Sequence, residues 1–270
     1  MKLTVVGCSG SVPGPESPAS SYLVQAPHEG RLFSLVIDLG PGALGALYRH
    51  LDPKDVDAFG LSHLHPDHCL DLCAYYVVAR YSPTAPWPRR PLYGPADTPS
   101  RLARAYDVPL ADADPDAAAA ESGPGVAEHF AFSVWQPRQV IGPFTVDVAR
   151  VAHPVEAYAV RISENVDGGG TLVFSGDTGP CDALVELARG VDLLLVESAF
   201  VERAGNPSGL HLTGRQAAEA GQAAGVGAVV LTHIPPWHDP DQVLAEATPH
   251  FAGPVSLAVA GAVWDIGQIG

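Results

Sequence analysis

Basic residues are scarce in this chain. Its 270 residues include 15 lysines and arginines against 30 aspartates and glutamates, which gives a formal net charge of −15. A surface this acidic repels a phosphate backbone at long range, so a large nucleic-acid ligand would need a local basic patch. The patch that stands out is small, "WPRRP" at Trp87–Pro91. The composition therefore argues against nucleic acid as a partner.

Long apolar runs are absent as well. No stretch approaches the ~20 apolar residues that a bilayer-spanning helix needs. The amino-terminal "MKLTVVGCSGS" has one lysine and a strand-like apolar stretch that is too short for a signal peptide. We therefore expect a cytoplasmic protein with no membrane partner.

Cysteine is rare and scattered, at Cys8, Cys69, Cys73 and Cys181. This distribution favours small buried residues in a reducing compartment over a disulfide framework. Cys69 and Cys73 have the spacing of one helical face, but no second pair completes a zinc site with them.

Short runs typical of β-strands dominate both halves of the chain. They are Leu3–Gly7, Tyr22–Gln25, Leu32–Asp38, Val56–Ser62, Phe144–Ala152, Ala157–Ile162, Thr171–Ser175, Val191–Glu197 and Val226–Thr232. Helix-like segments lie between several of them, at Cys69–Tyr81, Cys181–Arg189, Thr213–Gly225 and Pro240–Phe251. Strands in runs with helices at intervals predict an α/β protein in which sheets pack together and helices lie outside.

Two segments depart from this pattern. Pro83–Pro99 is proline-rich and is interpreted as an irregular surface loop, whose Trp87 and Tyr93 would pack in the core, make a dimer contact or stack a base. Ala111–Glu128 is acidic and alanine-rich and is interpreted as a solvent-facing connection. Neither resembles a domain linker, because the strands on both sides must share a core. We therefore predict a single domain over residues 1–270.

The stretch "SHLHPDHCLD" places three histidines and an aspartate within six positions, directly after a predicted strand and before a predicted helix. The spacing of His63, His65, Asp67 and His68 cannot put all four side chains on one helical face, so a loop must splay them. Such a loop could direct two imidazoles to one metal ion and the carboxylate and third imidazole to a second. Zinc, iron and manganese accept these ligand types.

Three further candidates each lie directly at the end of a predicted strand. They are His153 in "VARVAHP", Asp177 in "TLVFSGDTG" and His233 in "AVVLTHIPPW". Alone, each could be an ordinary turn residue. Because all three strand ends carry a residue that can bind metal, coincidence is a poor explanation, and together with the histidine cluster they predict one metal centre.

The ordered motifs "HLHPDH", "AHP", "SGDTG" and "LTHIPP" resemble those of the metallo-β-lactamase superfamily, over nearly the whole chain. The resemblance implies a four-layer αββα sandwich with the metal site at the strand ends. It further implies two divalent metal ions, zinc first and manganese or iron otherwise. One ion would be held by His63, His65 and His153 and the other by Asp67, His68 and His233, with Asp177 bridging them.

Two more residues narrow the branch of the family. "LLLVESAFVE" ends a predicted strand with Glu197, and "GLHLTGRQAAEAG" places His211 just before a predicted helix. This stretch is similar to ribonuclease Z and its phosphodiesterase relatives. A departing oxygen needs a proton or a positive charge, which His211 oriented by Glu197 could supply. Otherwise His211 would be an exposed residue at a helix start, and Glu197 would pair with a surface arginine.

The resemblance also suggests how the reaction would run. Two metals would generate the hydroxide that attacks phosphorus, and Asp67 would orient this nucleophile as well as bind metal. Ser9, Gly10 and Ser11, in the glycine-containing loop after the first strand, would form part of the substrate pocket, although a plain connecting loop is an alternative.

The phrases "GCSGSVPGPESPASSYLV", "LYGPADTPSRL" and "SGDTGPCDALVELARGVD" resemble an actinobacterial branch that includes atypical class II cyclic-nucleotide phosphodiesterases. This resemblance implies hydrolysis of 3′,5′-cyclic nucleotides, cyclic AMP first, and a possible homodimer. The alternatives are a ribonuclease Z that matures transfer RNA, and a hydrolase of small carboxyl esters, thioesters or lactones. The first would carry a projecting basic arm, which is not visible between the His68 and His153 motifs.

Overall fold

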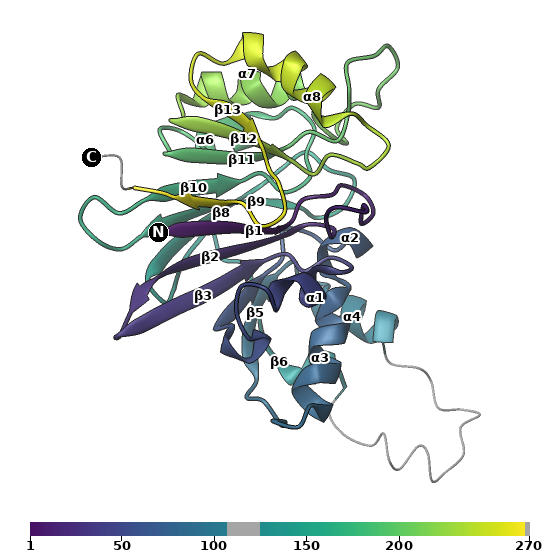
Figure 1. Ribbon diagram of the computed structural model, residues 1–270, viewed down its shortest axis with the longest axis vertical. Helices are drawn as coiled ribbons and strands as arrows, with labels where there is room; N and C mark the ends of the chain where they lie inside the picture. Colours follow the sequence, from purple (N-terminus) through teal and green to yellow (C-terminus); the bar gives the residue numbers. More distant parts are fainter. Residues whose placement is uncertain (107–124, 268–270) are drawn as a thin grey trace.

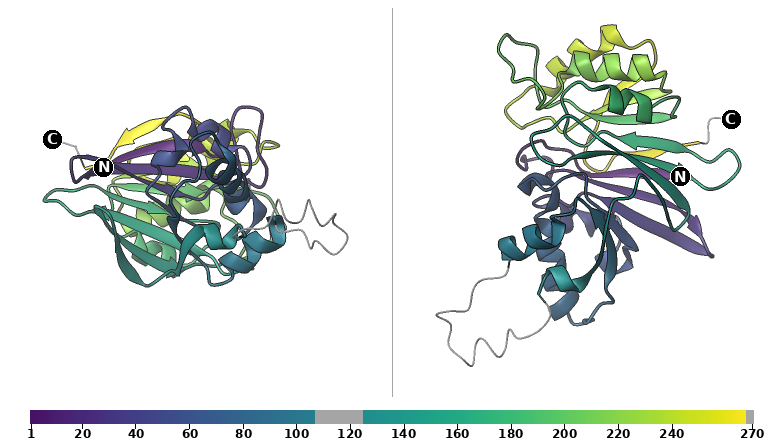
Figure 2. Two further views of the ribbon diagram at one scale, coloured as in Figure 1. Left: turned by 90° about the horizontal axis from the view of Figure 1, so that it is seen from below. Right: turned by 180° about the vertical axis from the view of Figure 1, so that it is seen from behind.

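The computed structural model describes residues 1–106 and 125–267. In this part of the chain, two seven-stranded sheets pack face to face and helices cover their outer sides (Figure 1). Figure 2 shows the same order from behind, with one group of helices at each end and the sheets between them. The predicted four-layer αββα sandwich, the metallo-β-lactamase fold, is thus confirmed.

The first sheet has the strand order β14-β1-β2-β3-β4-β5-β6. Its strands are β1 Lys2–Gly7, β2 Ser21–His28, β3 Arg31–Ile37, β4 Ala58–Gly60, β5 Arg90–Gly94, β6 Phe130–Val134 and β14 Val263–Asp265. Its helices are α1 Ala43–Leu47, α2 Pro66–Cys69, α3 Asp71–Tyr81 and α4 Thr98–Tyr106. Tyr75 of α3 packs edge-on against Phe59 of β4, with ring centroids 4.8 Å apart, which anchors the helix layer to the sheet.

The second sheet has the strand order β13-β12-β11-β10-β9-β8-β7. Its strands are β7 Arg138–Ile141, β8 Phe144–Arg150, β9 Tyr158–Glu164, β10 Thr171–Phe174, β11 Leu193–Glu197, β12 Ala228–Thr232 and β13 Val255–Leu257. Helices α6 Asp182–Leu187, α7 Gly214–Ala224 and α8 Pro240–Ala247 cover it (Figure 1). The sequence signals around α7 are confirmed, because Thr213 forms a capping box with Gln216 and Gly225 ends the helix in the left-handed conformation.

A buried apolar layer joins the two sheets. Tyr22 of β2 and Phe174 of β10 meet with ring centroids 4.7 Å apart, and Leu35, Ile37, Val160 and Leu195 around them are inaccessible to solvent or nearly so. The Tyr22 hydroxyl hydrogen-bonds the Thr232 hydroxyl across the sheets at 2.7 Å, so the buried phenol is satisfied. The metal-binding candidates follow strands at one edge of this layer.

The interpretation of Pro83–Pro99 as one irregular loop was wrong, because β5 lies within it. Pro91 is tolerated there since β4 pairs with β5 only from Leu92 onward, where backbone donors are available. Trp87 is 8% exposed and packs against Tyr75, which agrees with the core-packing alternative for this side chain.

The predicted acidic connection Ala111–Glu128 lies largely outside the described residues. Within the described ranges, no helix has both the length and the apolar character that a membrane crossing requires.

Candidate metal centre

The histidine motif is splayed by the start of helix α2. His65 has extended backbone angles and precedes Pro66, the first helical residue, so the chain changes from loop to helix within the motif. His63 and His65 therefore project from the loop, whereas Asp67 and His68 belong to the first turn of the helix. This break explains how four closely spaced side chains reach two different positions.

The first cluster joins the loop histidines to the second sheet. The Nδ1 atom of His65 lies 3.1 Å from His63 Nε2 and 3.1 Å from His153 Nε2, so three ring nitrogens converge. His153 follows β8, and Asp177, which follows β10, directs its Oδ2 atom to 3.6 Å from His63 Nε2. Ligand atoms of these four residues lie within 4.8 Å of one another.

The second cluster is built from helix α2 and from the end of β12. His233 Nε2 lies 3.1 Å from Asp67 Oδ2 and 3.2 Å from His68 Nε2. Asp177 Oδ1 completes the group at 3.2 Å from His68 Nε2 and 3.5 Å from His233 Nε2. Asp177 thus turns one carboxylate oxygen toward each cluster.

In His153 and His68, the ring nitrogen that faces away from the cluster is hydrogen-bonded to an acceptor, which leaves the nitrogen that faces the cluster free to bind a metal. His153 Nδ1 is 3.0 Å from the carbonyl oxygen of Leu210, which can only accept, so the proton sits on Nδ1 and Nε2 is free to bind a metal. His68 Nδ1 lies 2.7 Å from the Asp38 carboxylate, which favours the same assignment. The tautomers of His153 and His68 therefore match metal ligation.

The charges in the site also suit cations. Burial lowers the pKa of His63, His65 and His153, which keeps their imidazoles neutral. Burial alone would raise the pKa of Asp177, but the facing histidines, above all His233, outweigh it and hold that pKa well below the usual range. Asp177 Oδ1 is buried and accepts no hydrogen bond in the described chain. Burial opposes charge on His68, but the Asp177 and Asp38 carboxylates outweigh it and raise its pKa, so the second cluster favours a positive charge between its carboxylates. Neutral imidazoles in the first cluster and carboxylates that attract positive charge in the second fit divalent metal ions.

Asp38 supports this site and was not among the candidates from sequence. It follows β3 with a φ of 57°, accepts hydrogen bonds from the Ser62 amide and hydroxyl at 2.7 Å each, and contacts His68. A single Asp as the last residue of the predicted strand Leu32–Asp38 is a weak signal, although the Gly40-Pro41 turn that follows marks the point where the chain leaves the sheet. Asp38 fixes both the ring of His68 and the loop that begins the histidine motif.

Glu197 and His211 form a buried pair beside the clusters. Glu197 is inaccessible to solvent, and its Oε1 atom accepts from His211 Nδ1 at 2.9 Å and from the Thr178 amide at 3.0 Å, while Oε2 accepts from the Ala199 amide. Within the described ranges, Glu197 is buried and forms no ion pair with an arginine, so the alternative that it pairs with a surface arginine is wrong. Burial opposes charge on His211, but the hydrogen bond that Nδ1 donates to Glu197 outweighs it and raises the pKa of the imidazole.

The three predicted substrate-loop residues have different surroundings. The Ser9 hydroxyl donates to the Val12 carbonyl at 2.7 Å, so it is engaged within the loop. Gly10 packs so closely on His233 that a Cβ would lie 2.1 Å from the His233 carbonyl oxygen. The Ser11 amide lies 3.3 Å from His233 Nε2 and faces the second cluster. Of these three residues, Ser11 is the one whose backbone amide faces a candidate ligating nitrogen.

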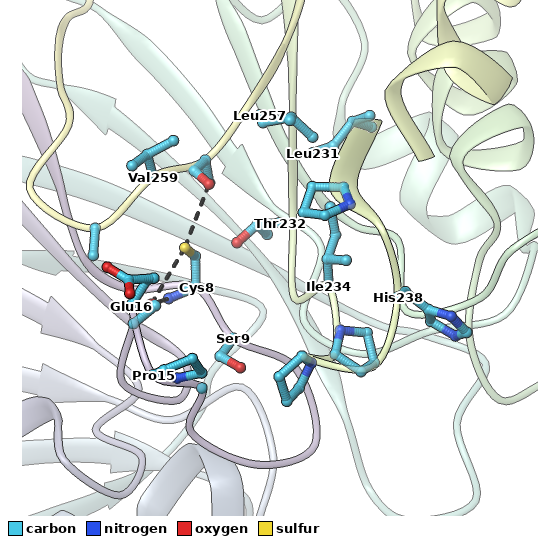
Figure 3. Close-up of a pocket in the computed structure, with 17 residues that line it drawn as sticks. Cys8, Ser9, Pro15, Glu16, Leu231, Thr232, Ile234, His238, Leu257 and Val259 are labelled. Carbon is cyan, nitrogen blue, oxygen red and sulfur yellow. Dashed lines mark hydrogen bonds between the residues drawn. The ribbon is translucent and has the colours of Figure 1, made fainter. Parts of the chain in front are cut away.

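A separate, mostly apolar pocket of about 410 Å³ lies behind this loop (Figure 3). Cys8 and Ser9 form one side of it, and Leu231, Thr232 and Ile234 form another. None of the seven candidate metal ligands lines this pocket. Its wall includes the carboxylate of Glu16 and no Lys or Arg, which makes it unsuited to an anionic phosphate.

Comparison with known proteins agrees with this geometry. Residues 34–234 match the family described as the beta-lactamase superfamily domain. An uncharacterized protein of Mycobacterium tuberculosis is 44% identical over 272 residues, covering 100% of this chain and 94% of that protein. The ribonuclease Z of Myxococcus xanthus is 29% identical over 308 residues, covering 97% and 96%.

Among solved structures, the metallo-beta-lactamase fold protein YhfI of Bacillus subtilis superposes with a TM-score of 0.78 and 29% identity, covering 98% of this chain and 99% of that one. Its sequence is described as a probable metallo-hydrolase and is 30% identical over 268 residues. With the family match over most of the chain and two histidine–aspartate clusters at the strand ends, this protein belongs to the metallo-β-lactamase superfamily, among its metal-dependent hydrolases.

Proposed function

We propose that the protein is a binuclear-metal phosphodiesterase that hydrolyses 3′,5′-cyclic nucleotides, cyclic AMP first. The observation that carries the proposal is the Glu197–His211 pair. Its imidazole lies beside both clusters, with its ring centroid 5.7 Å from that of His153 and 5.6 Å from that of His233. A proton donor at this place serves a reaction in which a poor leaving group, such as a ribose oxygen, departs.

Two divalent ions, zinc first, would be held by the two clusters. His63, His65 and His153 would take one and Asp67, His68 and His233 the other, with an oxygen of Asp177 for each. Bound there, the ions would supply Lewis-acid activation of water and neutralise charge on the phosphoryl oxygens. Asp67 lies at the edge of the second cluster, where its carboxylate would also orient the attacking water.

His211 would act on the leaving oxygen. Because its Nδ1 proton is held by Glu197, the other ring nitrogen, Nε2, is left to carry the transferable proton. In the reaction, a water molecule loses one proton to solvent as its oxygen bonds to phosphorus, the P–O3′ bond breaks, and O3′ takes the proton from Nε2, which solvent then restores. The raised pKa of His211 favours the protonated imidazole that this role needs. Glu197 is a positioning residue in this scheme.

A compact substrate is favoured by the charge of the chain. A net charge of −15 opposes a long phosphate backbone, but it opposes a monoanionic cyclic nucleotide far less. The competing candidate is a ribonuclease Z-type endonuclease, which the similarity to the Myxococcus xanthus ribonuclease Z favours. A hydrolase of small carboxyl esters, thioesters or lactones would use the metals without needing His211.

The deciding experiment supplies metal-replete protein with cyclic AMP, a precursor transfer RNA and a nitrophenyl carboxyl ester side by side. His65→Ala serves as the blank for contaminating activity. We expect turnover of cyclic AMP with little RNA cleavage. RNA cleavage at the 3′ trailer would support the endonuclease instead, and hydrolysis of the carboxyl ester alone would reject both phosphodiesterase candidates.

The role of His211 has its own test. His211→Ala should retain its metals, measured by elemental analysis, and lose turnover on cyclic AMP. The loss should be much smaller on bis(4-nitrophenyl) phosphate, because nitrophenolate leaves without a proton. Equal losses on both substrates would contradict the assignment.

A further inference from the structure

A second cavity adjoins the candidate catalytic centre through His211. It has a volume of about 510 Å³ and lies between the end of β11 and the start of α7, under the loop that joins them. His211 is one of its lining residues, together with Phe200, Arg203 and Asn206. None of the seven candidate metal ligands lines this cavity, so His211 is the residue that links it to the metal centre.

Phe200 forms a fixed wall of the cavity. Its amide donates to the Leu212 carbonyl at 3.0 Å, and it pairs with Thr213 as an isolated parallel bridge, so its backbone is tied to the start of α7. The half-buried ring stands at 85° to the His211 imidazole, with centroids 5.1 Å apart. An aromatic ring held in this way can receive a flat ring against its accessible face at little entropic cost.

Arg203 supplies a cation to the same cavity. Its Nε donates to Asn206 Oδ1 at 2.9 Å, and Asn206 in turn donates to the Val201 carbonyl at 2.9 Å, which holds the pair on the loop. No ion pair joins Arg203 to a carboxylate in residues 1–106 and 125–267. Arg215, which lines the same cavity, is by contrast neutralised by Glu202 and Glu219. The exposed guanidinium of Arg203 therefore keeps its charge available to a ligand in this cavity.

We propose that this cavity binds the nucleobase of the substrate, with Phe200 stacking on the base and Arg203 donating to acceptor atoms on its edge. The inference rests on the proposed function, because it assumes that the group leaving from phosphorus belongs to a nucleoside. Stacking on an aromatic ring tolerates every base, and an arginine donor can pair with the ring-nitrogen or carbonyl acceptors of a base edge, such as N7 of a purine. Phe200 and Arg203 are therefore specificity residues rather than catalytic ones.

The test compares two substrates that differ only in the base. One is cyclic AMP and the other is 1-O-methylribose 3′,5′-cyclic phosphate, which has the same phosphodiester ring without a base. Phe200→Leu should raise KM for cyclic AMP about tenfold, as loss of one stacking contact does, and leave kcat and the baseless substrate within about twofold of wild type. Arg203→Ala should act in the same direction. Tyr81→Leu, an exposed ring on α3, is the matched control.

The outcomes separate the two proposals. If Phe200→Leu lowers kcat equally on both substrates, the ring merely positions His211, and the base-binding inference is overturned. The inference is also overturned if wild type hydrolyses both substrates and neither variant changes KM. Wild-type protein that hydrolyses neither substrate would instead overturn the proposed function itself.

Discussion

Replacing Asp38 with asparagine is the sharpest test of how the site is supported. Asp38 never touches the predicted metal positions, yet its Oδ2 atom lies 2.7 Å from His68 Nδ1 and its two oxygens accept both donors of Ser62. Asparagine has nearly the same shape and tolerates the φ of 57° at this position. Asp38→Asn therefore removes the charge and one acceptor while leaving the backbone as it is.

The expected magnitude follows from these contacts. The new amide group must face either the Ser62 amide or His68 Nδ1, and each of these is a buried donor that then lacks an acceptor. An unsatisfied buried donor costs about 1–3 kcal/mol of stability. His68 can avoid an unsatisfied Nδ1–H by moving its proton to Nε2, but Nε2 is then protonated and can no longer bind metal. Loss of such a supporting carboxylate weakens metal affinity by about 10- to 100-fold.

The assay is a competition titration of zinc against a chromophoric chelator, combined with thermal unfolding of the metal-free and metal-loaded protein. Asp57→Asn is the matched control, since Asp57 is a half-buried carboxylate that accepts the Ser34 amide and pairs with Arg31. We expect weaker zinc binding for Asp38→Asn and wild-type zinc binding for the control. Wild-type affinity and stoichiometry in Asp38→Asn would refute the proposed support of His68.

Three other changes are informative. Asp177→Ala should reduce the metal content measured by elemental analysis at both positions and abolish turnover; an unchanged stoichiometry would exclude Asp177 as a shared ligand. Gly40→Ala should destabilise the protein and impair metal loading, because the added Cβ would lie 1.9 Å from the Asp67 carbonyl oxygen; normal loading would mean that the loop yields freely. Asp57→Asn should lower the free energy of unfolding at neutral pH by about 1 kcal/mol. The figure is kept this small because Arg31, the ion-pair partner, is exposed and solvent screens the pair. Burial alone would raise the pKa of Asp57, but the hydrogen bonds that it accepts from Arg31 outweigh burial, so the pKa is lower in the folded protein. The carboxylate therefore stabilises the fold above pH ~4, the pKa of an unfolded Asp, and this stabilisation is lost as the pH falls further. Denaturation across pH 2–7 should show the two proteins converging in acid, and a constant difference would contradict this.

The sequence predicted the site better than the sheets that carry it. His153, Asp177 and His233 were recognised because residues that bind metal rarely end three strands by chance, and the structure brings them together with the histidine motif. The helix caps Thr213 and Gly225 were also readable, because capping depends on local chemistry. Each of these signals is contained in a few neighbouring residues.

What was missed depends on contacts between distant segments. Strand β5 lies in a proline-rich stretch, and its identity as a strand comes from its parallel pairing with β6, some 40 residues away. The short edge strands β13 and β14 likewise become visible only through their partners β12 and β1. Asp38 has no motif of its own, because its role arises from the approach of His68 across the loop. Local patterns do not encode such long-range encounters.

The candidate ligands are divided between the two sheets. His63, His65, Asp67 and His68 follow β4 of the first sheet, while His153, Asp177 and His233 follow strands of the second. Ions held by both sets would cross-link the halves of the sandwich, and since only the folded chain assembles the ligands, binding adds about 4 kcal/mol of stability at a thousandfold excess over Kd. Protein without metal would then be less stable as well as inactive. The supply of the ion would decide how much of the chain survives proteolysis.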